Sequence, residues 1–136
     1  MIAITDYLAG VPLFLAYFAV ALVLTGIYVL VYTWCTPHEE MKLIRADVSA
    51  AAIAFAGSLI GFVLPLASVI ENSINLVDMA LWGGVALIVQ LATFFGLRLF
   101  IPQISEHIAD NKLASGIWLG GVSIAAGLLN AACLTY

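Results

Sequence analysis

The sequence contains little charge. Only 9% of its 136 residues are Asp, Glu, Lys or Arg, and four of them are basic, whereas 65% are hydrophobic. Soluble domains carry about a quarter charged residues and about half apolar ones. The composition therefore excludes an ordinary soluble domain and predicts an integral membrane protein surrounded by bilayer lipid. Four basic residues and a net charge of −4 also exclude the cationic stripe that nucleic-acid binding requires.

Catalytic and metal-binding signatures are missing too. The sequence has no nucleophile elbow, no glycine loop that could cradle a phosphate, and no His and Cys constellation with catalytic spacing. The two cysteines, Cys35 and Cys133, are expected at opposite membrane faces, beyond the reach of a disulfide. His and Glu adjoin in two connections, but without zinc-motif spacing we interpret them as solvated charges. We therefore expect no enzyme, no cofactor and no metal.

Four apolar stretches are long enough to cross a bilayer as helices. A span needs about 20 residues, and the stretches cover residues 11–32, 48–70, 77–99 and 114–134. None shows the period-two alternation of membrane strands. The sequence thus predicts an all-α integral membrane protein with four helices in a single membrane domain, 1–136. Pro65, inside the second stretch, predicts a kink or a broken last turn.

Basic residues indicate the orientation in the membrane. Lys42 and Arg45 lie in the first connection, Lys112 in the third, and Arg98 at the end of the third span that faces the same side. The termini and the middle connection contain no Lys or Arg. Because basic residues collect on the cytoplasmic side, the first and third connections are predicted in the cytoplasm and both termini in the periplasm.

The two halves of the chain resemble each other. Ala19-Val20-Ala21-Leu22-Val23 matches Gly84-Val85-Ala86-Leu87-Ile88, and the same offset carries Pro37 onto Pro102. After a one-residue gap, Asp47 falls on Asn111 and Ala56-Gly57 on Gly120-Gly121. The pattern predicts two parallel two-span repeats, about 11–70 and 77–135, related by an axis along the membrane normal.

Helix-start signals occur at matching places in these repeats. Asp47 and Asn111 are expected to N-cap the second helix of their repeat. Thr36-Pro37-His38-Glu39 forms a capping box, so we expect a short helix from about residue 37 to 44. A similar segment with a weaker box covers residues 102–108.

Small residues give the second helix of each repeat a narrow face. Such a face lets helices approach closely in lipid, where apolar side chains gain little by leaving the tails. The favoured interpretation is tight packing inside the bundle, and the alternative is the seam or pore of a homo-oligomer. We expect a homo-oligomer in either case. The residues of this face are Gly57, Gly61, Gly116, Gly120 and Gly121.

Polar residues within the spans form a second candidate set, which comprises Thr25, Ser58, Gln90, Ser123 and Asn130. Ser and Thr can bond to carbonyls of their own helix, whereas the amide of Gln90 is costly in lipid without a partner. The favoured interpretation is interhelical hydrogen bonding, and the alternative is a polar permeation or substrate site. No Asp, Glu, Lys or His lies at a span centre, which argues against a proton-coupled transporter but not against a channel.

Four stretches carry a likeness to known proteins: Thr36-Pro37-His38, residues 54–65, Trp82-Gly83-Gly84-Val85-Ala86-Leu87, and Leu129-Asn130-Ala131-Ala132-Cys133. Together they resemble the YjfL-type family of small bacterial inner-membrane proteins, built from tandem two-helix units. The resemblance spans nearly the whole chain and implies a multi-pass inner-membrane location. The family has no established activity, so it implies no catalytic residue. Some members are encoded beside phage-shock-like coiled-coil proteins, which implies a role in envelope homeostasis or stress response and a soluble partner of that type.

Two function classes follow from these features. The first is a non-catalytic, homo-oligomeric membrane platform whose cytoplasmic face docks a soluble partner. The second is a small oligomeric channel or exporter for ions or small solutes, with Thr25, Ser58, Gln90 and Ser123 near the path. The residues of the predicted docking face are His38, Glu39, Glu40, Lys42, Arg45, Glu106 and His107.

Overall fold

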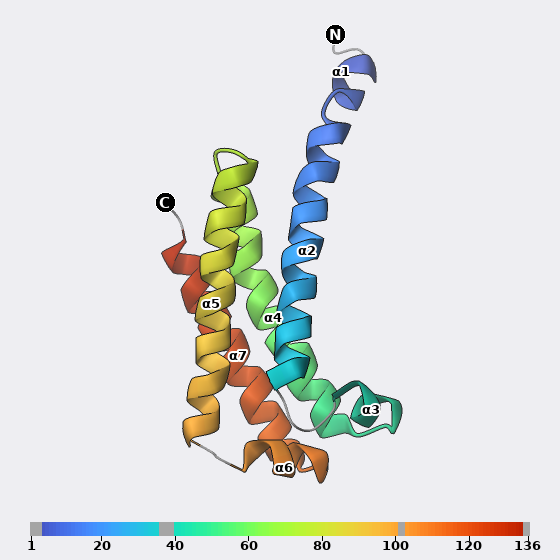
Figure 1. Cartoon of the computed structure of the whole chain (residues 1–136), viewed down its shortest axis with the longest axis vertical. Coiled ribbons are helices and arrows are strands. Elements are labelled where there is room, and N and C mark those ends of the chain that lie inside the picture. Colours follow the sequence, from blue (N-terminus) through green and yellow to red (C-terminus); the bar gives the residue numbers. More distant parts are fainter. Residues whose placement is uncertain (1–3, 36–39, 101–102, 135–136) are drawn as a thin grey trace.

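The computed structural model describes residues 4–35, 40–100 and 103–134, and this part of the chain is built from helices (Figure 1). The prediction of an all-α protein with four membrane-length helices is confirmed. Helices long and apolar enough to cross a membrane cover Ile4–Trp34, Ser49–Asn72, Leu76–Leu97 and Leu113–Cys133. The elements are α1 (Ile4–Leu8), α2 (Val11–Cys35), α3 (Glu40–Arg45), α4 (Ser49–Asn72), α5 (Leu76–Phe100), α6 (Ile104–Ala109) and α7 (Leu113–Cys133).

The long helices alternate in direction. α2 and α5 run towards the end of the bundle where the short helices α3 and α6 lie, and α4 and α7 run back (Figure 1). We call the end with α3 and α6 the connection end, and the opposite one, where both chain termini lie, the terminus end. α4 and α7 are therefore parallel neighbours, and their contact is the most extensive one between any two helices.

Glycines bring the backbones of α4 and α7 together. Each of five glycines faces the backbone of the other helix so closely that an added Cβ atom would collide with it. Gly57 meets Gly120, for example, and Gly116 lies against the carbonyl oxygen of Ala50. In lipid, such close approach lets van der Waals contacts hold helices that gain nothing from leaving water. The glycines of this seam are Gly57, Gly61, Gly116, Gly120 and Gly127.

Pro65 lies inside α4 without ending it. The predicted broken last turn is absent, because α4 continues to Asn72. Proline has no N–H, so the carbonyl of Gly61, four residues earlier, loses its helical donor. Gly127 of α7 faces that same carbonyl oxygen with its Cα. The absence of a side chain at Gly127 thus lets α7 pack directly against the carbonyl that Pro65 leaves without its helical donor.

The two short helices end in the same backbone motif. Asp47 and Asn111 follow α3 and α6 and have φ values of 64° and 59°, in the left-handed region. The Val48 N–H bonds to the Leu43 carbonyl, and the Asp47 N–H to the Ile44 carbonyl, both at 3.0 Å. These two bonds define a Schellman motif. The same pair of bonds recurs at α6, 64 residues later, which is the offset that aligns Asp47 with Asn111. The two-repeat arrangement itself stays a prediction.

The predicted N-cap role of Asp47 and Asn111 is wrong. The N-cap residues are Val48 for α4 and Lys112 for α7, and neither makes a side-chain cap hydrogen bond. Asn111 instead caps the other long helix, since its Oδ1 accepts the Ala50 N–H of α4 at 3.0 Å. The side chain thus ties the end of α6 to the start of α4, an arrangement that requires α4 and α7 to lie side by side.

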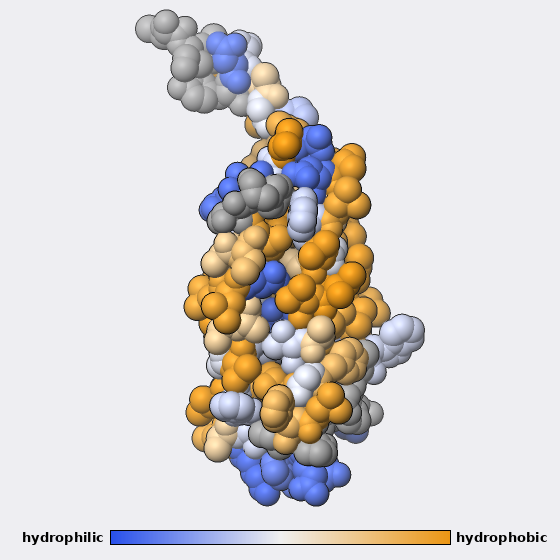
Figure 2. All heavy atoms as spheres, turned by 90° about the vertical axis from the view of Figure 1, so that its left-hand side faces the viewer, coloured by the Kyte–Doolittle hydropathy of each residue, from blue (hydrophilic) through white to orange (hydrophobic). Residues whose placement is uncertain are grey.

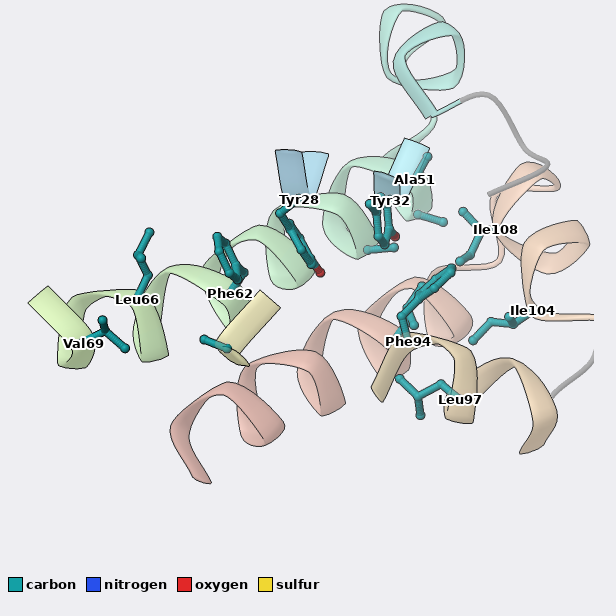
Figure 3. Packing of buried hydrophobic residues seen from close by; sticks show 14 of the residues in the cluster. Tyr28, Tyr32, Ala51, Phe62, Leu66, Val69, Phe94, Leu97, Ile104 and Ile108 are labelled. Atoms are coloured by element: carbon teal, nitrogen blue, oxygen red, sulfur yellow. The ribbon is translucent and has the colours of Figure 1, made fainter. Parts of the chain in front are cut away.

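Aromatic side chains attach α2 to the bundle near the connection end. Tyr28 stacks on Phe62 of α4 with ring centroids 4.7 Å apart, and Tyr32 lies 4.8 Å from Phe94 of α5 (Figure 3). Towards the terminus end α2 diverges from the other helices (Figure 1). It leaves an open apolar cleft of ≈ 130 Å³ lined by Phe14, Tyr17, Phe18, Ala21 and Ile70.

The glycine seam predicts a sharp difference between two neighbouring substitutions. Gly120→Leu places a large side chain against the α4 backbone, and we expect it to lower the free energy of unfolding by about 2 kcal/mol or more. Gly121→Leu is the matched control, because Gly121 is exposed and has no atom near its Cβ position. Thermal unfolding of both variants in the same detergent measures the difference. Equal losses would contradict the seam.

A second pair of variants tests the capping by Asn111. Glycine adopts a positive φ without strain, so Asp47→Gly is expected to leave stability unchanged or raised. Asn111→Gly relieves the same strain but removes the bond to the Ala50 N–H, and we expect a net loss of about 0.5 kcal/mol, since a cap contributes about 1 kcal/mol. Hydrogen exchange at Ala50 reports the same event, with faster exchange in Asn111→Gly alone. Similar exchange in both variants would show that Asn111 is not the cap.

Candidate functional site

Three of the predicted intramembrane polar residues meet in the middle of the bundle. Gln90 comes from α5, Ser58 from α4 and Ser123 from α7, and their side chains are 1%, 1% and 2% exposed. The glycine seam positions them, because Ser58 and Ser123 lie on the two backbones that it brings together. Burial at this depth means that the cluster belongs to the interior of one chain.

Hydrogen bonds organise this polar cluster around Ser123. The Gln90 Nε2 donates to the Ser123 carbonyl oxygen at 2.9 Å, and the Ser123 Oγ donates to the Leu119 carbonyl at 2.7 Å. The Oγ atoms of Ser58 and Ser123 are 3.4 Å apart. Since the Ser123 proton is already committed, Ser58 is the donor in that contact. Gly61 makes room for the amide, because a Cβ there would lie 2.6 Å from the Gln90 Nε2.

The amide of Gln90 is only half satisfied. Its Oε1 is buried and accepts no hydrogen bond from any residue that the structure describes. An unpaired polar atom in an apolar interior costs roughly 1–3 kcal/mol. Gln90 therefore combines a stabilising interhelical bond with an open acceptor.

The other two intramembrane polar residues lie elsewhere. Thr25 bonds back to its own helix, from Oγ1 to the Ala21 carbonyl at 2.8 Å. Asn130 lies on α7 towards the terminus end, and its buried Nδ2 finds no acceptor among residues 4–35, 40–100 and 103–134. The neighbouring Ala131 carbonyl accepts a bond from the Ser68 Oγ at 3.0 Å, which adds a second link between α4 and α7.

The predicted small-residue face divides in the structure. Gly57, Gly61, Gly116 and Gly120 lie in the seam, whereas Gly121 is exposed on another side of α7. Gly127 was not in the predicted set. The helical period could have revealed it, because 116, 120, 123 and 127 follow one face of a helix.

The connection end carries the charged candidates. Lys42, Arg45 and Glu106 are exposed, and His107 is half-buried with its Nδ1 3.4 Å from the Ser115 Oγ. Figure 2 shows hydrophilic residues gathered at this end, below a broad apolar band. His38 and Glu39 of the predicted docking face lie outside the described residues, as does the side chain of Glu40. Within the described part, no group of three His, Cys, Asp or Glu residues could hold a metal ion.

Four membrane-length helices around a buried amide, with polar residues at both ends, define a multi-pass membrane protein. The chain belongs to the family described as Domain of Unknown Function (DUF350), whose model matches residues 6–134. It is 41% identical over 123 residues to the UPF0719 inner membrane protein YjfL of Escherichia coli K12, covering 90% of this chain and 93% of that protein. The counterpart in Escherichia coli O157:H7 gives the same figures. No solved structure matches the chain. The resemblance inferred from the motifs is thereby confirmed.

The cluster predicts which polar residue stabilises the bundle. Gln90→Leu removes the bond to the Ser123 carbonyl, and interhelical hydrogen bonds in membranes contribute about 0.6 to 1.7 kcal/mol. We expect a loss of about 1 kcal/mol, the contribution of this interhelical bond. Thr25→Val is the control and should be nearly neutral, because that hydroxyl bonds only within α2. Reversible unfolding of the two variants in one lipid–detergent mixture measures both; a larger loss for Thr25→Val would contradict the assignment.

Proposed function

We propose that this chain is a non-catalytic protein of the bacterial inner membrane that forms a homo-oligomer. We further propose that it serves as a platform for a soluble partner in envelope homeostasis or stress response. The location is supported by its relatives, which are described as inner membrane proteins. The observation that carries the platform role is the placement of α3 and α6 together at one end of the bundle (Figure 1).

The proposed orientation puts the connection end in the cytoplasm and both termini in the periplasm. Lys42, Arg45 and Lys112 all lie in the segments of the connection end. The rule that basic residues stay on the cytoplasmic side supports this orientation. A soluble cytoplasmic partner would then meet α3 and α6 directly.

The docking surface that we propose combines charge with a groove. Exposed Lys42 and Arg45 lie on α3, and exposed Glu106 lies on α6, so the surface carries both signs. Mixed charge favours selection among partners, because a wrong pairing brings like charges together. A charged coiled coil of the phage-shock-like type fits this pattern. Beside α3 lies a groove of ≈ 420 Å³ lined by Ile44, Asp47, Val48, Ser49, Ala52 and Ile53.

The alternative, a small oligomeric channel or exporter, receives less support. A polar pore between copies would draw its lining from the outer surface of the protomer. Ser58, Gln90 and Ser123 are instead at least 98% buried within one chain. The Thr25 hydroxyl donates to a carbonyl of its own helix. These placements favour structural hydrogen bonding over a path lined by these residues.

Homo-oligomerisation draws its support from α2. In the most apolar 18-residue window of the span that contains α2, 6% of the residues are buried inside the chain, so the exposed face of α2 is open to lipid or to a second copy. A complex of several copies would also multiply a docking surface of modest charge, which raises the avidity for a repetitive partner.

The test separates the platform from the channel with two variants of the full chain. Lys42→Glu combined with Arg45→Glu should abolish rescue of a deletion strain under envelope stress, and should leave solute flux in proteoliposomes unchanged. Gln90→Leu should rescue normally. Loss of rescue and flux in Gln90→Leu, with the charge-reversed variant active, would establish the channel instead.

The mass of the assembly is measured on the same preparations. Native mass spectrometry should give more than one chain per particle in nanodiscs. A monomer both in nanodiscs and in mild detergent would contradict the homo-oligomer.

A further inference from the structure

The carbonyl oxygen of the Gln90 side chain is an acceptor without a donor at the centre of the bundle. Only 1% of Gln90 is exposed, and its Oε1 accepts no hydrogen bond from a described residue. In a soluble protein, side-chain motion could bring such an atom to water. Here the bundle is surrounded by hydrocarbon, which offers no donor.

The orientation of the amide is set by its surroundings. The Nε2 donates to the Ser123 carbonyl oxygen at 2.9 Å. A flipped amide would place Oε1 against that carbonyl, oxygen against oxygen, and would lose the bond. The side-chain amide therefore keeps this orientation, and Oε1 remains the atom without a hydrogen bond.

The two hydroxyl protons of the cluster already have acceptors. The Ser123 hydroxyl donates to the Leu119 carbonyl at 2.7 Å, and the Ser58 hydroxyl has the Ser123 Oγ at 3.4 Å as its acceptor. The latter distance is long for an O–H···O bond. The cluster thus contains one acceptor in need of a donor, one hydroxyl donor with a weak acceptor, and a second Nε2 proton besides the one donated to Ser123.

We propose that a single buried water molecule binds at the Gln90 Oε1, between α5 and the α4–α7 pair. A water donates two protons and accepts two, and buried waters typically make two to four hydrogen bonds to polar groups that the protein leaves unsatisfied. It donates to Oε1 and accepts from the second proton of Nε2 or from Ser58. Buried Ala86 precedes Gln90 by one helical turn, so the neighbouring side chain on the same face of α5 is small.

A metal cation fits this site less well. Hard cations require several oxygen ligands, and Oε1 is the one carbonyl oxygen of the cluster that has no partner. The Ser123 carbonyl already accepts the Gln90 amide. No carboxylate lies on these helices at this depth to balance the charge. The proposal stands apart from the platform role and does not depend on it.

The experiment uses the scarcity of glutamine in the chain, which contains only Gln90 and Gln103. The full chain is labelled with ¹³C,¹⁵N-glutamine in lipid bilayers, and solid-state NMR records magnetisation transfer from water. Exposed Gln103 is the positive control, and the backbone carbonyl of Gln90 is the negative control within the same residue. The Gln90→Leu variant assigns the signals by removing one set.

We expect the Gln90 side-chain carbonyl to receive magnetisation from water several-fold faster than its own backbone carbonyl does. The signal should be unchanged when sodium and potassium are replaced by choline. Equal, slow transfer to both Gln90 carbonyls would show an unhydrated amide and overturn the proposal. A shift of the side-chain signal with the choice of cation would overturn it in favour of an ion site.

Discussion

The backbone contact between α4 and α7 is the constraint on which the rest of the structure depends. A bilayer offers no hydrophobic drive for helices to associate, so they must gain from close contact and hydrogen bonds. Five glycines allow that approach, from Ala50 to Gly61 on α4 and from Gly116 to Gly127 on α7. The pair then brings the Ser123 carbonyl within reach of Gln90 and the Asn111 side chain within reach of Ala50. Without the seam, both of these bonds would lose one partner.

The other two long helices, α5 and then α2, are attached less extensively than α4 and α7 are to each other. α5 contributes the buried amide of Gln90 and the packing of Phe94. α2 packs through Tyr28 and Tyr32 near the connection end, with Val20, Ala21 and Leu24 also against the core, and diverges towards the terminus end. A helix with few contacts in the chain is the one whose position a neighbouring molecule can change at least cost. The structure thus combines a rigid central pair with a loosely attached outer helix.

The sequence was sufficient to predict those features that depend on composition and on regular spacing. The four spans follow from apolar length, and the interhelical role of Gln90 follows from the cost of an amide in lipid. It failed where the outcome depends on two segments meeting. Asp47 and Asn111 have the composition of N-caps, but each closes a Schellman motif, and Asn111 caps a helix 61 residues away. Gly127 faces α4 and Gly121 faces away from it. The presence of glycines in the sequence does not by itself tell which of them face the other helix.

The distribution of polar groups constrains where function can be located. Polar side chains at mid-membrane are used for holding helices together, so a substrate moving through the bilayer would have to break the bonds that define the fold. The charged residues, by contrast, lie near the ends of the long helices and in the segments between them, and Figure 2 shows hydrophilic residues gathered at the connection end. At the connection end, exposed Lys42 and Arg45 lie on α3 and exposed Glu106 on α6, and the Asn111 side chain ties the end of α6 to the start of α4. Helices position exposed charge more precisely than loops do, which a recognition surface requires. This property supports recognition at the ends of the bundle over transport through its centre.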